Sequence, residues 1–169
     1  MSLLSDPFFI RNMVYGLEDS LISTTGVVVG TTFAGMPLKY IVTAGLILVF
    51  VEALSMAFGS LVSEESFMIT SKKKYTNAQI WFYALTMFFS YFVAGILVLL
   101  PYIFAVPYHY VISIVISIVG LFLIVFFIQK DLYKALLLSF AGSIILALTI
   151  AVGRMFDKKE PRGNQMRVL

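Results

Sequence analysis

The chain has 169 residues, of which 60% are hydrophobic and 12% are charged, with a net charge of +3 and a mean hydropathy of +0.98. Soluble domains carry about 45–50% apolar residues and cannot bury this much apolar surface, so the composition predicts an integral membrane protein. The absence of cysteine excludes disulfides and thiolate metal sites, and the basic residues flank apolar runs, which argues against nucleic-acid binding.

The apolar runs are long enough for five membrane-spanning helices, because about 20 residues cross a bilayer as a helix. The runs are continuous rather than alternating, which favours helices over strands. We expect an all-α domain over residues 1–156, followed by a charged, disordered tail at 157–169. In chain order the predicted spans are residues 13–34, 40–62, 80–100, 111–128 and 135–152, and the second and third of them end at Ser63–Glu65 and at Pro101.

Five spans place the N-terminus and the second and fourth connections on one side of the membrane. That side holds the Lys72–Lys74 run, in a short connection. Lysine and arginine in short loops mark the cytosolic side, so we expect a cytosolic N-terminus. These charges leave open whether the host is the plasma membrane or an organellar membrane.

Three of the nine acidic residues fall inside predicted spans: Glu18, Asp19 and Glu52. A carboxylate at the centre of a membrane helix costs on the order of 2.5–3.5 kcal/mol. No lysine or arginine lies deep in a span to neutralise these acids. Each of them must therefore be protonated, face water or bind a cation.

The depths of these residues predict a cation site. At 1.5 Å per residue, Asp19 lies about 12 Å, Glu52 about 16 Å and Met56 about 10 Å from the cytosolic face. The first two spans are antiparallel, so the three residues can meet on adjacent helices. Two carboxylates and a thioether suit a borderline divalent ion such as Fe²⁺ better than Na⁺ or Ca²⁺. Burial favours the neutral form of a carboxyl, so such a site can exchange a proton for a metal ion, with Glu52 as the expected proton carrier.

Further polar residues follow the same helix faces. Ser60 continues the face of Glu52 and Met56, and Ser23 continues the face of Asp19. Ser60 is either a secondary ligand or a hydroxyl bonded within its own helix. Glu18 is either part of the site or an interfacial acid near a helix start.

Two other pairs have alternative interpretations. Glu64 and Glu65 either collect cations at the cytosolic mouth or form a solvated helix end. Gly26 and Gly30 form a GxxxG motif, which lets two helices approach closely. The partner helix is either one of the same chain or the same helix of a second copy in a homodimer.

Four stretches, taken in order, resemble the vacuolar iron transporter family. They are YGLEDSLISTTGVVVGTTFAG, EALSMAFGSLVSEES, ALTMFFSYFVAGILVLLPYIF and ALLLSFAGSIILALTIAVGRMF, in the first, second, third and fifth spans. The resemblance implies a homodimeric five-helix transporter that moves Fe²⁺, and often Mn²⁺, out of the cytosol in exchange for protons. The family's metal-handling aspartate, glutamate and methionine correspond to Asp19, Glu52 and Met56.

The chain departs from the family pattern at three places. The Asp-Gly of the family is Asp19-Ser20 here, and the glutamate after Met-Ala-x-Gly is Ser60. The acidic metal-binding domain that many members insert after the second span is replaced by a short basic connection. This chain therefore resembles a short member without that domain.

We expect a proton-coupled transporter of a divalent transition metal, without a permanently bound cofactor and without enzymatic activity. Two alternatives stay open: a membrane scaffold or assembly protein in which the acids only bond across helices, and a transporter of another cation.

Overall fold

The structure is a computed structural model that describes residues 6–71 and 76–157. Within these residues the chain forms five helices and no strand, as expected for an all-α protein. The Lys72–Lys74 run and the tail after Asp157 lie outside the described residues. The helices are α1 (Pro7–Phe33), α2 (Leu38–Ser71), α3 (Asn77–Ile103), α4 (His109–Gln129) and α5 (Leu132–Asp157).

Local chemistry explains several of the helix ends. Asp6 caps α1 by accepting a hydrogen bond from the Phe8 N–H, and Pro7 occupies the first turn, where no N–H is needed. Thr76 and Gln79 form a reciprocal capping box at the start of α3. Gly35 follows α1 with a φ of 77°, a left-handed conformation that glycine adopts without strain.

Several helices extend beyond the predicted spans, and the two helix ends assigned to particular residues are wrong. The second span was expected to end at Ser63–Glu65, but α2 continues to Ser71, because Glu64 has a partner on another helix and is not a solvated stop. Pro101 was expected to stop the third span, but it lies inside α3, which ends at Ile103. Proline removes the helix hydrogen bond to the residue four positions before it, a loss that membrane helices tolerate because neighbouring groups can satisfy the freed carbonyl oxygen.

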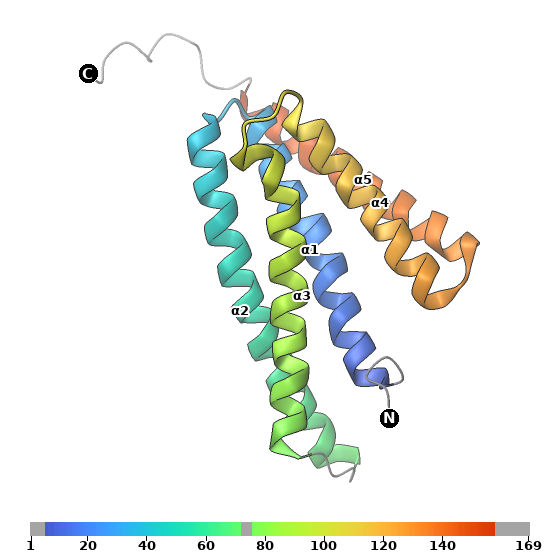
Figure 1. The fold of residues 1–169 in the computed structure, drawn as a ribbon. Helices are drawn as coiled ribbons and strands as arrows, with labels where there is room; N and C mark the ends of the chain where they lie inside the picture. Colours follow the sequence, from blue (N-terminus) through green and yellow to red (C-terminus); the bar gives the residue numbers. More distant parts are fainter. Residues whose placement is uncertain (1–5, 72–75, 158–169) are drawn as a thin grey trace.

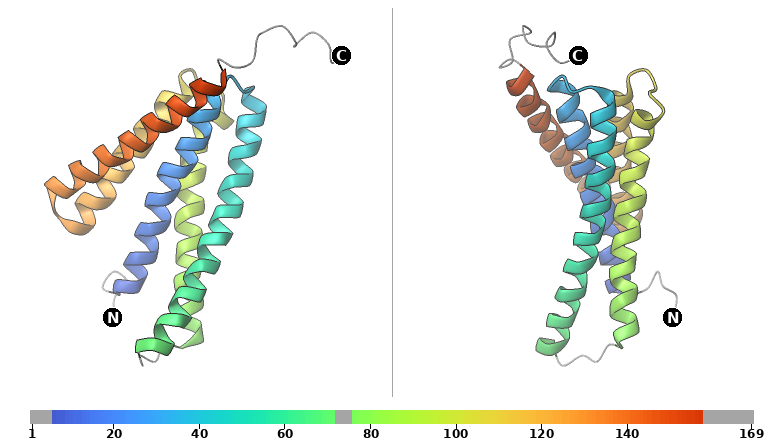
Figure 2. Two further views of the ribbon diagram at one scale, coloured as in Figure 1. Left: turned by 180° about the vertical axis from the view of Figure 1, so that it is seen from behind. Right: turned by 90° about the vertical axis from the view of Figure 1, so that its left-hand side faces the viewer.

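α1 lies at the centre of the bundle. It contacts all four other helices, whereas α2 contacts only α1 and α3 among the described elements. Successive helices run in opposite directions, so the chain enters at one end and α5 finishes at the other (Figure 1). The α4–α5 hairpin diverges from the start of α1, as Figure 1 and the left-hand view of Figure 2 show.

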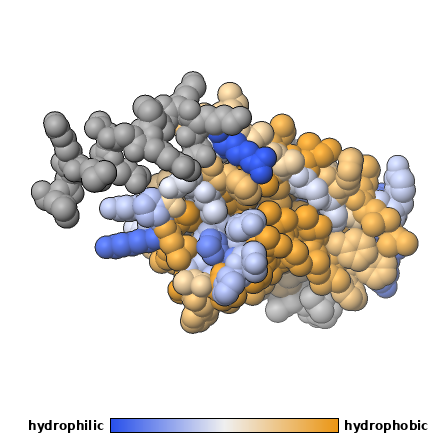
Figure 3. Space-filling view, turned by 90° about the horizontal axis from the view of Figure 1, so that it is seen from above, coloured by the Kyte–Doolittle hydropathy of each residue, from blue (hydrophilic) through white to orange (hydrophobic). Residues whose placement is uncertain are grey.

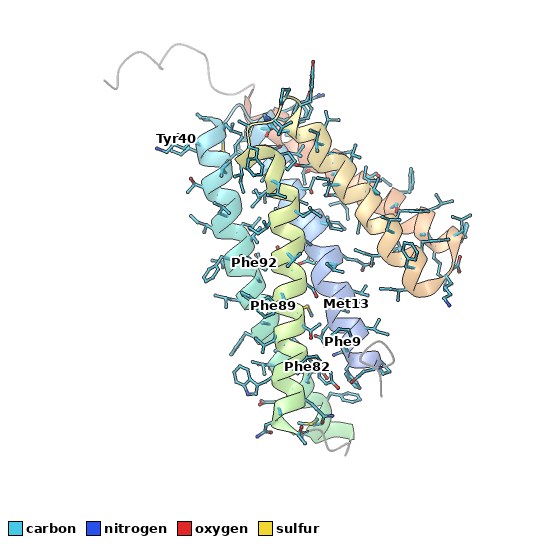
Figure 4. All side chains as sticks on the ribbon, viewed as in Figure 1. Phe9, Met13, Tyr40, Phe82, Phe89 and Phe92 are labelled. Carbon is cyan, nitrogen blue, oxygen red and sulfur yellow. The ribbon has the colours of Figure 1, made fainter. Side chains whose placement is uncertain are left out.

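Within the described ranges, four helices are long and apolar enough to cross a membrane: α2, α3, α4 and α5. α1 is long enough but is not one of the four, because it contains Glu18, Asp19 and many hydroxyl residues. Large apolar side chains cover the outside, and Tyr40 is among those that project outward from the bundle (Figure 4). Seen from the end where α1 finishes, hydrophilic residues occupy part of the surface and hydrophobic residues much of the rest (Figure 3).

The GxxxG motif packs against a helix of the same chain. A Cβ atom at Gly26 would lie 3.3 Å from the Thr149 side chain, and one at Gly30 would lie 3.3 Å from the Thr149 carbonyl oxygen. A Cβ atom at Gly153 would overlap the Gly30 carbonyl oxygen. Of the two interpretations of this motif, packing within the chain is the one that the structure contains, and the α1–α5 crossing depends on it.

Candidate functional site

A network of polar side chains fixes how α1 and α2 pair. Arg11 of α1 forms an ion pair with Glu64 of α2, although the Glu64 side chain is only 3% exposed. Ser60 donates a 2.6 Å hydrogen bond to the Asn12 amide oxygen. Asn12 is itself buried, and its amide nitrogen donates to the Phe8 carbonyl oxygen. These contacts set the register between the two antiparallel helices.

That register brings the predicted ligands to similar depths. Asp19 lies eight residues from Arg11, and Met56 lies eight residues from Glu64, so each is about 12 Å along its helix from the ion pair. Glu52 is one turn further along α2. Asp19 and Glu52 are close enough to interact electrostatically. Asp19 and Glu52 thus lie on adjacent helices within electrostatic range of each other, and Met56 follows Glu52 by one turn of α2.

A groove of about 680 Å³ runs between α1, α2 and α5. Glu52 and Ser23 both line it, whereas Asp19 and Met56 are not among its lining residues. Its α1 wall also contains Gly26 and Gly30, and Thr149 lines it from α5. Asp19 is exposed, and Glu52 and Met56 are half-buried.

The two adjacent acids of α1 face different neighbours. Glu18 lines a separate cleft of about 460 Å³, together with Arg11, Tyr15 and Ile128. This cleft lies where the α4–α5 hairpin diverges from α1. Consecutive residues on a helix point about 100° apart, which accounts for the separation of Glu18 from Asp19. Glu18 therefore does not join the pair formed by Asp19 and Glu52.

The predictions for the other polar residues of α2 are only partly confirmed. Glu65 is exposed, as expected for a solvated acid, but Glu64 is buried beside Arg11, so its interpretation as part of a solvated helix end is wrong. The Ser60 hydroxyl bonds to Asn12 on α1, not within its own helix.

Ser20, the residue after Asp19, is accommodated by α3. Ser20 is fully buried, and a Cβ atom at Gly95 would lie 2.9 Å from its oxygen and 2.6 Å from a Val49 methyl group. The absence of a side chain at Gly95 therefore leaves room for Ser20 next to Asp19. Within the described part of the chain, the Ser20 hydroxyl has no hydrogen-bond partner.

Sequence reasoning missed three residues of this region: Arg11, Asn12 and Tyr91. Arg11 was used only to mark the membrane face, and Asn12 was not considered, although an amide so close to a span is an available signal. Tyr91 of α3 is fully buried, and its hydroxyl lies 2.7 Å from the Ser23 oxygen. A tyrosine in an apolar run gives no signal of its own, because such residues are common in helix packing.

The donor set consists of oxygen and sulfur atoms. Among the described residues no three histidine, cysteine, aspartate or glutamate side chains form a cluster. The candidate ligands are the carboxylates of Asp19 and Glu52, the Met56 thioether and the Ser23 hydroxyl, of which Glu52 and Ser23 line the groove. Neither Asp19 nor Glu52 forms an ion pair with a basic side chain in the part of the chain that the structure describes. The region can thus accept positive charge from outside the protein.

These features define a class: an integral, multi-pass helical membrane protein with acidic side chains between two of its helices. The chain matches the sequence model of the VIT family over residues 10–79, which include most of α1, all of α2 and the start of α3. This match supports the assignment of the chain to the VIT family, a family of transporters, and confirms the resemblance of its first two spans. Comparison with curated proteins and with solved structures finds no match.

Proposed function

We propose that this protein carries a divalent transition metal, Fe²⁺ or Mn²⁺ or both, out of the cytosol in exchange for protons. The observation that carries the proposal is the approach of Asp19 to Glu52 without a basic partner among the described residues. Family membership supports transport of a metal ion across a membrane. The choice of metal, the proton coupling and the direction belong to the proposal.

Asp19, Glu52 and Met56 are the proposed ligands of the transported ion. Carboxylate oxygens attract a divalent cation strongly, and the thioether favours softer transition metals over Ca²⁺. Proton coupling requires a carboxyl group that can exchange a proton for a metal ion, and burial in a membrane bundle favours such an exchange because it disfavours the charged form. Glu52 lines the groove and is half-buried, so it is the proposed proton carrier.

The membrane arrangement follows from the same residues. We propose that α1 crosses the bilayer as a fifth span, since the other four helices all contact it. The N-terminus and the α2–α3 connection then face the cytosol. A homodimer that joins two copies along the groove would bring two sets of acids around one pathway.

Metal uptake into sealed vesicles that contain the purified protein tests this proposal. An opposing pH gradient should drive accumulation of Fe²⁺ or Mn²⁺, and dissipation of the gradient should stop it. The Asp19→Asn, Glu52→Gln double variant should fold and lose at least nine tenths of the uptake. Glu65→Gln is the matched control, because Glu65 is an exposed acid of α2.

The alternatives give different results. A scaffold in which the acids only bond across helices predicts that the double variant unfolds at lower temperature and that the wild type transports no metal. A transporter of another cation predicts that neither Fe²⁺ nor Mn²⁺ raises the unfolding temperature of the wild type. Undiminished uptake by a folded double variant would remove the proposed site.

A further inference from the structure

Tyr91 connects the candidate site to a helix that does not line it. Tyr91 lies in α3 and is fully buried, and its hydroxyl is 2.7 Å from the Ser23 oxygen of α1. Ser23 lines the groove together with Glu52, whereas no residue of α3 lines that groove. A buried tyrosine thus holds the hydroxyl of a residue on the groove wall.

The two hydroxyls share their surroundings with the carboxylate pair. Tyr91 interacts electrostatically with both Asp19 and Glu52. Asp19 and Ser23 are one turn apart on the same face of α1. The Ser23 hydroxyl therefore belongs to the same polar region as the proposed ligands.

The bond to Tyr91 gives Ser23 an orientation that it would not otherwise have. A serine in a helix commonly donates its proton to a carbonyl oxygen of the preceding turn. Ser23 has one proton and two lone pairs, and so can either donate to Tyr91 or accept from it. When Ser23 donates to Tyr91, its lone pairs are available to a cation. When Tyr91 donates, the Ser23 proton is available to a carboxylate. The two arrangements differ only in the rotation of the Ser23 and Tyr91 O–H bonds, and no proton leaves either residue.

We propose that Tyr91 is a positioning residue that holds Ser23 as an oxygen ligand for the divalent cation as it passes Glu52. This inference rests on the proposed function and names a determinant of its metal preference. Oxygen ligands suit Mn²⁺, and the Met56 sulfur suits softer ions. The Tyr91–Ser23 pair therefore raises the preference of the site for Mn²⁺ relative to Fe²⁺.

The chain contains a matched control on the same two helices. Tyr102 of α3 is also fully buried, and its hydroxyl is 3.0 Å from the Thr32 oxygen of α1. Thr32 does not line the groove, and it lies about 20 Å beyond Asp19 along the helix axis. Both tyrosines therefore bond α3 to α1, but only Tyr91 does so beside the acids.

The test is the concentration dependence of Mn²⁺ and Fe²⁺ uptake into sealed vesicles. Tyr91→Phe and Ser23→Ala should each raise the half-saturating Mn²⁺ concentration about three- to tenfold, as expected for one lost polar contact, and change that for Fe²⁺ less. Ser23→Thr keeps the hydroxyl and should keep the Mn²⁺ value. Tyr102→Phe should change neither metal. The Tyr91→Phe, Ser23→Ala double variant should be no worse than Ser23→Ala, because both changes act through one oxygen.

Equal effects of Tyr91→Phe and Tyr102→Phe, or equal losses for the two metals, would mean that Tyr91 serves only packing and would overturn the inference. Thermal unfolding of each variant identifies a general loss of stability. If Tyr91→Phe does not fold, the comparison of Ser23→Ala with Ser23→Thr decides: identical Mn²⁺ values overturn the inference. Wild-type protein that takes up neither metal would overturn the proposed function itself, and this inference with it.

Discussion

α1 and α4 show opposite uses of polarity in the same bundle. α1 contains two acids and is too polar to be one of the four apolar spans, yet it contacts every other helix. α4 is strongly apolar and much of its surface is exposed, but the side chains it buries include those of Ser113 and Ser117, while Val115 and Val119 face outward. Both helices therefore turn their hydroxyl groups toward the interior.

The difference between α1 and α4 shows which residues place a helix at the centre of a membrane bundle. Lipid solvates apolar side chains as well as a protein core does, so hydrophobicity does not decide which face is buried. Small and polar residues decide it, because they allow close approach and bond across helices. In α1 these residues recur every four positions and form a single stripe along the buried face: Asn12, Gly16, Ser20 and Thr24.

The largest loss of stability is expected from a substitution where α1 and α5 cross. Gly153→Ala would place a methyl group onto the backbone of Gly30, where no flexible side chain can yield. We expect the variant to lose about 1–3 kcal/mol or more of unfolding free energy, because α5 must move away from α1. Reversible unfolding in mixed micelles measures this loss.

Gly59→Ala is the matched control for that crossing. Gly59 lies in α2, and a Cβ atom there meets nothing within 4 Å. Alanine is favoured over glycine in a helix by about 1 kcal/mol, so this variant should be as stable as the wild type or more so. Equal stability of the Gly153 and Gly59 variants would show that the close contact between α1 and α5 does not exist.

The next largest loss of stability concerns the ion pair between Arg11 and Glu64. Removing one partner should cost more than removing the other. Arg11→Ala leaves the Glu64 carboxylate buried without its ion-pair partner, and should cost about 1–3 kcal/mol. Glu64→Gln leaves Arg11, whose side chain is 45% exposed, to be solvated by water, and should cost about 1 kcal/mol or less. The double variant should recover part of the Arg11→Ala loss. Unfolding free energies that rank the two single variants in the opposite order would contradict this account.

Much of this arrangement could be predicted from the sequence. The lengths of the apolar runs predicted five helices, and counting residues from the ends of antiparallel spans brought Asp19 to the depth of Met56. The end of α2 could not be predicted in this way, because Ser63–Glu65 looks like a terminus unless the partner of Glu64 is known. That partner, Arg11, is 53 residues away in the chain.

The same limit applies to the contact between Tyr91 and Ser23. These residues are 68 positions apart, and the pairing depends on how α3 is rotated against α1. Rotation is set by small residues on both helices: a Cβ atom at Gly16 would lie 2.8 Å from the Met87 carbonyl oxygen. A single sequence identifies the small residues but not which helix each of them faces.

A smaller loss of stability is expected when α4 loses its hydroxyl contact with α1. Ser117 and Thr25 form a buried hydroxyl pair between α4 and α1. Ser117→Ala removes that bond and should cost about 0.6–1.7 kcal/mol, as polar contacts between membrane helices do. Val119→Leu, on the exposed face of the same helix, should change the unfolding free energy by less than about 0.5 kcal/mol. An equal response to both changes would mean that α4 does not bond to α1 through its hydroxyl stripe.

The smallest effect is a pH dependence of the folding stability, which arises from Asp6 at the start of α1. The Tyr83 hydroxyl donates to Asp6 across 2.6 Å, and this bond, together with the Phe8 N–H, holds the pKa of Asp6 below its ordinary value of 3.8. The contribution to stability is complete above pH 3.8 and is lost as the pH falls further through the lowered pKa, because the unfolded chain takes up the proton first. Asp6→Asn keeps a capping side chain and should cost less than about 1 kcal/mol at neutral pH. Its unfolding temperature should fall less than that of the wild type between pH 5 and pH 2, and parallel curves would exclude Asp6 as the titrating group.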